Sequence, residues 1–196
     1  MPRSTARARL RRPWLWMGIA LLLMIFIVLD RSGWILVQRH DDIREYNGAR
    51  VRINDVLNAH TLVIDRRDPV HDSPVTHVRL WGIDAPRLPR PGRDADPGAE
   101  TAWRTSSDRV LHERVTLWLE THRTRDRLGR LLAHVELETG EMLSEYLLHR
   151  GLGQTNERWP HRWLEPYAHA EMRARQAGRG MWGDQWPPDS PSAQPN

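Results

Sequence analysis

The distribution of apolar residues divides the chain into two unequal parts. Residues 13–29 form a run without a charged side chain, whereas the chain after position 48 alternates short apolar runs with polar turns. A helix rises about 1.5 Å per residue and needs roughly 17–25 residues to cross a bilayer core. Trp14, Trp16 and Trp34 lie near the ends of the run, where amphipathic rings favour the headgroup layer. The pattern predicts a transmembrane anchor over 13–29, extending to about 37 with its interfacial residues.

The charges around this run predict its orientation. Five arginines precede it and only Arg31 follows closely, so residues 1–12 are expected to be a cytoplasmic N-terminus and the rest to be exported. A cleaved signal peptide is the alternative, but no pair of small residues follows the apolar run. We therefore expect a single-pass protein of a bacterial inner (plasma) membrane, with residues 38–48 as a linker.

The remaining chain has the texture of a small α+β domain. β-Type runs occupy 49–55, 60–65, 75–84, 115–120 and 131–138, and turn-rich segments separate them. Helical patterns start near Pro97, Gly140 and Trp163. Three strands, a helix, two strands and two helices predict a five-stranded OB-type β-barrel with about three packed helices over 49–183. Residues 184–196 are expected to be a disordered, proline-rich tail.

Composition adds two constraints. The 196 residues include no cysteine, which excludes disulfides, thiolate metal sites and a cysteine nucleophile. The pI near 10.4 suggests a polyanion partner, but residues 1–40 carry a net charge of +6 and residues 41–196 a net charge of −2. Net charge therefore gives no argument for nucleic-acid binding by the folded part.

Four segments share their order and spacing with a known family. They are "VRLWGIDAP" (78–86), "GAETAWRTSSDRVL" (98–111), "DRLGRLLAHVELETGEMLSEYLLHRGLG" (126–153) and "MWG" (181–183). In these segments the chain resembles the thermonuclease, or staphylococcal-nuclease-like, family of calcium-dependent phosphodiesterases. The resemblance extends over about 49–183 and implies the same barrel fold.

The resemblance also implies roles for individual residues. Arg79 and Arg130 match the two arginines that contact the phosphate, and guanidinium suits this task because it binds two oxygens and stays charged. Asp84 matches one of the two carboxylates that hold Ca²⁺. For Arg79, an ion pair with Asp84 is a purely structural alternative.

Two positions depart from the family pattern. The second metal-binding aspartate is replaced by His60, within "NAHT" (58–61), and the catalytic glutamate that acts as general base is replaced by Arg87. Imidazole is a poor Ca²⁺ ligand, and a guanidinium cannot accept a proton. The sequence thus lacks the matching glutamate and one metal ligand, so whether it is an enzyme is left open. We expect no cofactor, because the family's Ca²⁺ site is predicted to be lost.

Three functional hypotheses follow. The first is a pseudoenzyme that binds nucleic acid, another phosphate-bearing ligand or a protein, with Arg79, Arg87, Arg130 and Trp159 at the binding site; Trp159 would be a stacking platform or a packed core residue. The second is an active DNA or RNA endonuclease that uses a rearranged metal site formed by His60, Asp84 and Asp94 or Asp96. The third is a scaffold in a membrane complex.

Overall fold

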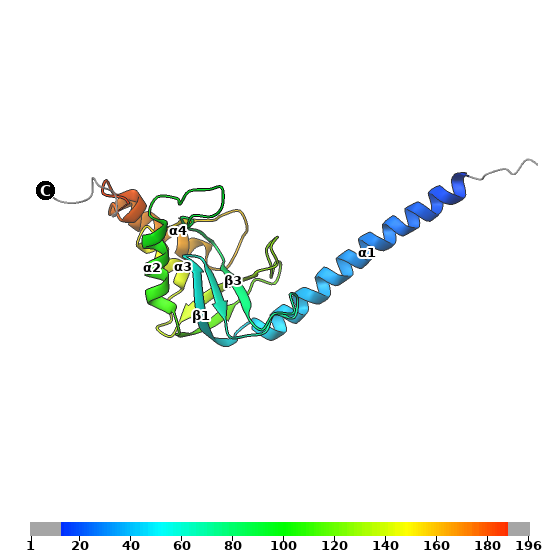
Figure 1. The fold of residues 1–196 in the computed structure, drawn as a ribbon, viewed down its shortest axis with the longest axis horizontal. Coiled ribbons are helices and arrows are strands. Elements are labelled where there is room, and N and C mark those ends of the chain that lie inside the picture. The colour runs from blue at the N-terminus through cyan, green and yellow to red at the C-terminus, as the bar shows by residue number, and fades with distance from the viewer. Residues whose placement is uncertain (1–12, 188–196) are drawn as a thin grey trace, which may run out of the picture. The chain divides into compact units, whose positions relative to one another are not determined.

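A closed five-stranded barrel forms the body of the protein (Figure 1). The computed structural model describes residues 13–187, so the predicted N-terminal segment 1–12 and most of the predicted tail lie outside the described residues. The barrel strands, in spatial order, are β1 (Arg50–Asn58), β2 (Thr61–Ile64), β3 (Thr76–Leu80), β6 (Leu131–Leu137) and β5 (Arg114–Trp118). Their inward side chains, such as Ile53, Leu62 and Val135, are fully buried.

Short elements and helices surround this barrel. A two-stranded sheet pairs β4 (Ile83–Asp84) with β7 (Gln154–Thr155). Helix α2 (Ala99–Val110) packs on β1, α3 (Leu143–His149) packs on β6, and α4 (Leu164–Gln176) packs on α3 (Figure 1). A 3-10 turn, η1 (Gly180–Trp182), follows α4. The described chain thus has four α-helices and one 3-10 turn, instead of an anchor and about three helices.

Helix α1 (Pro13–Tyr46) corrects the predicted N-terminal organisation. It continues through the expected linker, and the chain divides into two units, residues 1–41 and 42–196. Among the described residues, no helix has the length and apolar character that crossing a membrane requires. The predicted transmembrane helix over 13–29 is therefore wrong, and so is the predicted single-span membrane partner. The uncharged run has only the minimum length for a span, and α1 continues beyond it through charged residues from Asp30 to Glu45.

Strand register brings the predicted phosphate-contacting residues together. Arg79 of β3 pairs with Thr61 of the antiparallel strand β2 and with Leu132 of the parallel strand β6. Arg130 directly precedes β6, so it reaches the same end of the barrel and donates from Nη1 to Thr61 Oγ1 at 3.1 Å. Residues about 50 apart in sequence therefore share one site because the barrel closes through β3 and β6.

A buried ion network lies within the larger unit. The guanidinium of Arg125 binds Asp42 at 2.8 Å and Asp68 at 2.9 Å, and all three side chains are at most 6% exposed. Burial alone lowers the pKa of Arg125, but its hydrogen bonds to the two carboxylates outweigh burial and raise the pKa above its usual value. This network connects the last turns of α1 to the loops that precede β3 and β6.

We expect Arg125→Met to destabilise the protein by about 3–5 kcal/mol, because it leaves two buried carboxylates without their cation. Denaturant unfolding at neutral pH measures this loss. The matched control is Arg66→Met, since Arg66 pairs with Glu45 at 2.7 Å but both side chains are at least 37% exposed. That control is expected to cost less than about 1 kcal/mol. Equal losses in the two variants would contradict this interpretation of the network.

Candidate anion-binding site

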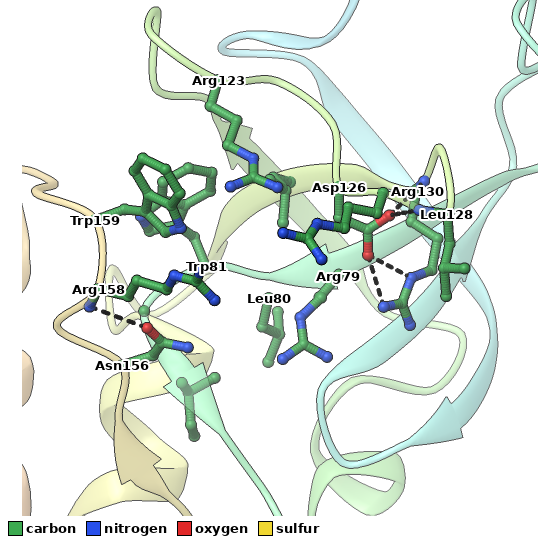
Figure 2. A pocket seen from close by; sticks show the side chains of 14 residues that line it. Arg79, Leu80, Trp81, Arg123, Asp126, Leu128, Arg130, Asn156, Arg158 and Trp159 are labelled. Atoms are coloured by element: carbon green, nitrogen blue, oxygen red, sulfur yellow. Dashed lines mark hydrogen bonds and ion pairs between the residues drawn. The ribbon is translucent and has the colours of Figure 1, made fainter.

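A cavity of about 340 Å³ opens beside β3 and the loop that precedes β6 (Figure 2). Six charged side chains line it. One is the acid Asp126, and the other five are cations: Arg79, Arg123, Arg127, Arg130 and Arg158. Asp126 is already neutralised, because its Oδ2 accepts hydrogen bonds from Arg130 Nε at 2.8 Å and Nη2 at 2.6 Å. The lining therefore carries a large excess of positive charge although the residues after position 40 have a net negative charge.

Asp84, the predicted metal ligand, has both oxygens engaged. Its Oδ1 lies 2.6 Å from Arg79 Nη2, and its Oδ2 accepts a hydrogen bond from Asn156 Nδ2 at 2.6 Å. Antiparallel pairing of Asp84 with Gln154, between β4 and β7, brings Asn156 to this position. The structural alternative for Arg79, an ion pair with Asp84, is thus present in the molecule.

His60 lies buried behind these arginines. This residue belongs to the two-residue turn between β1 and β2 and is only 4% exposed. Burial, reinforced by the charges of Arg79, Arg130 and Arg87, lowers the pKa of His60 to about 3, so the imidazole is neutral at neutral pH. Its Nδ1 has no hydrogen-bond partner among the described residues.

Arg87 lies on the exposed loop after β4 and does not line the cavity. Its backbone N–H donates to Asp96 Oδ2 at 3.0 Å, and Arg93 Nη2 donates to Asp96 Oδ1 at 2.8 Å. The predicted three-arginine pocket therefore holds Arg79 and Arg130 together and leaves Arg87 at its periphery. Asp96, one of the acids considered as a substitute ligand, is bound within its own loop.

The residues at this site do not fit a divalent metal ion. In residues 13–187, no three carboxylate or imidazole side chains lie close enough to share one. Of the two family ligand positions, Asp84 is bound to a guanidinium and His60 is a neutral imidazole surrounded by cations. Positive charge at this density disfavours a second cation and favours an anion.

Trp159 forms one wall of the cavity and is 42% exposed, so it is not a core residue. The guanidinium carbons of Arg123 and Arg158 lie 4.9 Å and 5.8 Å from the centre of its ring. These distances are within the range of cation–π attraction. Figure 2 shows Trp159 beside Arg123 and Arg158 on the side of the cavity away from Arg130.

A buried aromatic cluster supports the floor of the cavity. His134 Nδ1 shares a hydrogen bond with Tyr167 Oη at 2.9 Å, and the His161 ring packs 4.9 Å from the His134 ring. Gly82 lines the cavity above them with φ +75°, and a Cβ there would lie 2.7 Å from His161 and 2.8 Å from Tyr167. Glycine is required at this position on both conformational and steric grounds.

Several contributors to the site were missed by sequence reasoning. Asn156, Arg123 and Arg158 lie outside the segments that carry the family resemblance, or at positions where the pattern specifies nothing. Their only sequence signal is the density of arginine in the two loops "THRTRDRLGR" (121–130) and "NERWPHR" (156–162). Because every basic residue in this chain is arginine, that density alone did not distinguish a site from the background.

The barrel and its cavity define a nuclease-like domain. The chain belongs to the staphylococcal nuclease family: the model described as "Staphylococcal nuclease homologue" matches residues 77–184, more than half of its length. It is also 33% identical over 119 residues to a probable endonuclease LCL3 of Schizophyllum commune (strain H4-8 / FGSC 9210), and 33% identical over 116 residues to a probable endonuclease LCL3 of Coccidioides posadasii (strain C735).

These alignments cover only part of the relatives. Each includes 54% of this chain, but 40% of the first relative and 36% of the second. Both relatives are fungal proteins, which does not point to a bacterial inner membrane. Together with the absence of a membrane-crossing helix among the described residues, this corrects the predicted localisation.

The buried histidines make stability depend on pH. Burial lowers the pKa of His60 to about 3 and that of His134 to about 2, whereas unfolded histidine titrates near 6.5. A neutral buried histidine therefore stabilises the fold above pH 6.5, and this contribution is lost as the pH falls below 6.5, where the unfolded chain binds the proton first.

When the pH falls from about 7.5 to about 5, the parent is expected to lose about 2 kcal/mol more of its unfolding free energy than His60→Gln. The variant loses less because one buried neutral histidine has been removed. Denaturant unfolding at the two pH values measures the difference. His77→Gln, which removes an imidazole at an exposed position, is the matched control. Parallel pH profiles for the parent and His60→Gln would contradict the buried neutral state of His60.

Proposed function

We propose that this barrel binds single-stranded nucleic acid through its phosphates and does not hydrolyse it by the calcium-dependent mechanism of its family. The observation that carries the proposal is the cavity lining, where five arginines face one already paired aspartate. Phosphodiester oxygens are the ligands that a fork of guanidinium donors fits best. The binding role suits the fold, since barrels of this type bind single strands in a basic groove beside exposed aromatic rings.

Two residues support the proposal that the chain does not hydrolyse phosphodiesters by the calcium-dependent mechanism of its family. Arg87 stands where the general base would be and cannot accept a proton, and loss of a general base costs about 10²–10⁴-fold in rate. Asp84 is bound to Arg79 and Asn156, so a Ca²⁺ ion would have to break a charge-assisted hydrogen bond within a cationic site. Without the metal, several kcal/mol of transition-state stabilisation are lost as well.

Within this proposal Arg79 and Arg130 bind a phosphate directly. Their side chains are 19% and 21% exposed, so they are held in place by the barrel yet accessible from the cavity. Burial lowers the pKa of Arg79, while the neighbouring Asp84 opposes this effect and favours the charged form. A nucleic-acid ligand also agrees with the relatives named as probable endonucleases.

We expect the full chain to bind an oligothymidine with the same affinity in EDTA and in calcium, and to leave it intact in both. Fluorescence anisotropy measures binding, and gel electrophoresis of the same samples measures cleavage. Arg79→Gln and Arg130→Gln are each expected to weaken binding. Each is also expected to make the plot of log K against log salt less steep by about 0.7, because one phosphate contact is lost. Calcium-dependent cleavage by the unmodified chain would overturn the proposal.

A gain-of-function control tests why the site is inert. The quadruple variant Asn58→Asp, Ala59→Gly, His60→Asp and Arg87→Glu restores the residue types that the family has at these positions. Calcium-dependent cleavage by this variant alone would attribute the inactivity to the lost ligand and base. If neither protein cleaves but both bind the strand in EDTA, the binding role stands and the explanation of inactivity fails.

A further inference from the structure

Two arginines of the cavity lie against a tryptophan and not against an acid. Arg123 belongs to the loop between β5 and β6, and Arg158 and Trp159 belong to the loop between β7 and α4. The two guanidinium carbons lie 4.9 Å and 5.8 Å from the centre of the Trp159 ring, so they are at most about 10.7 Å from each other. The negative face of an indole ring attracts guanidinium, which explains why both cations gather there.

Neither guanidinium is neutralised by the protein. In residues 13–187, no carboxylate forms an ion pair with Arg123 or Arg158, whereas Arg79 and Arg130 each have one. Hydrogen bonds nevertheless hold both residues, and Arg123 Nε donates to the carbonyl oxygen of Arg125 at 3.2 Å. Arg123 pairs with Glu120 in an isolated β-bridge, and the N–H of Arg158 donates to Asn156 Oδ1 at 3.1 Å. The same Asn156 binds Asp84, so this pair is coupled to the Arg79 site.

The arrangement changes the role expected of Trp159. An aromatic platform for bases needs a free ring face, yet two guanidiniums already lie within cation–π distance of this ring. Trp159 is thus better suited to hold cations than to stack a base. Cations that lie close together on a ring, line an open cavity and have no protein anion provide a site for an external anion.

We propose that Arg123 and Arg158 form a second phosphate subsite, with Trp159 as their positioning residue, which binds a phosphate of the strand next to the one on Arg79 and Arg130. This proposal rests on the proposed function and specifies its ligand. The ligand is a single strand with at least two phosphates in the cavity, not a mononucleotide. Recognition at this subsite depends on the backbone and is independent of the bases.

Arginine variants test the second subsite. Arg123→Gln and Arg158→Gln are each expected to weaken binding of an oligothymidine of about eight nucleotides roughly two- to fivefold, and to reduce the salt slope by about 0.7. Their affinity for thymidine 5′-monophosphate, measured by competition, is expected to stay at the parent's value. The matched control is Arg104→Gln, because Arg104 is exposed on α2, pairs with Glu100 and does not line the cavity.

The outcomes separate this proposal from the proposed function. If Arg79→Gln weakens oligonucleotide binding and the Arg123 and Arg158 variants behave like Arg104→Gln, the second subsite is overturned and the proposed function stands. If the unmodified chain binds neither the oligonucleotide nor the mononucleotide, the proposed function fails and the subsite fails with it. Equal weakening of both ligands by Arg123→Gln would also overturn a separate subsite.

A base-free ligand tests the role of Trp159. Trp159→Leu is expected to weaken binding of the oligothymidine and of an abasic phosphodiester chain of the same length by the same factor, because the tryptophan acts through the two arginines. Trp159→Tyr, which keeps an aromatic face, is expected to restore most of the affinity. A loss that appears with oligothymidine and disappears with the abasic chain would show base stacking and overturn the positioning role.

Discussion

The proposed function depends most on the 2.6 Å contact between Arg79, near the end of β3, and Asp84, at the end of β4. This carboxylate binds a guanidinium on one oxygen and an amide on the other, and the positive charge of the guanidinium disfavours a cation beside it. Arg130 is paired with Asp126, whereas Arg123 and Arg158 have no ion pair among residues 13–187. In the function proposed above, this ion pair is the reason that the family's metal position takes an anion instead of a cation.

The fold supplies this arrangement through strand register and through one small added sheet. Pairing of β3 with both β2 and β6 brings Arg79, Thr61 and Arg130 together, and the β4–β7 pair carries Asn156 to Asp84. The second pairing also positions the loop that contains Trp159. His161 and Tyr167 beneath Gly82 complete this support, since any side chain at position 82 would collide with them.

The sequence predicted the barrel strands well because their order and the family segments agree, and each segment constrains its neighbours by spacing. It failed at the N-terminus, where an uncharged run with terminal tryptophans and flanking arginines was interpreted as an anchor, while the described helix extends through charged residues to Tyr46. Arg79 and Arg130, which line the cavity, and Asp84, which binds Arg79, lie in the motif segments. Asn156, Arg123 and Arg158 were not identifiable from the sequence, because long-range strand pairing and cation–π contacts leave no local periodic pattern.

The most direct test of the converted site is a crystal structure of the full chain with a short oligothymidine, grown in calcium-containing buffer. We expect the Arg79–Asp84 ion pair to be intact, a phosphate to contact Arg79 and Arg130, and no divalent ion to lie beside Asp84. A calcium ion bound to Asp84, with Arg79 displaced from the carboxylate and a water molecule directed at the phosphate, would contradict the central claim.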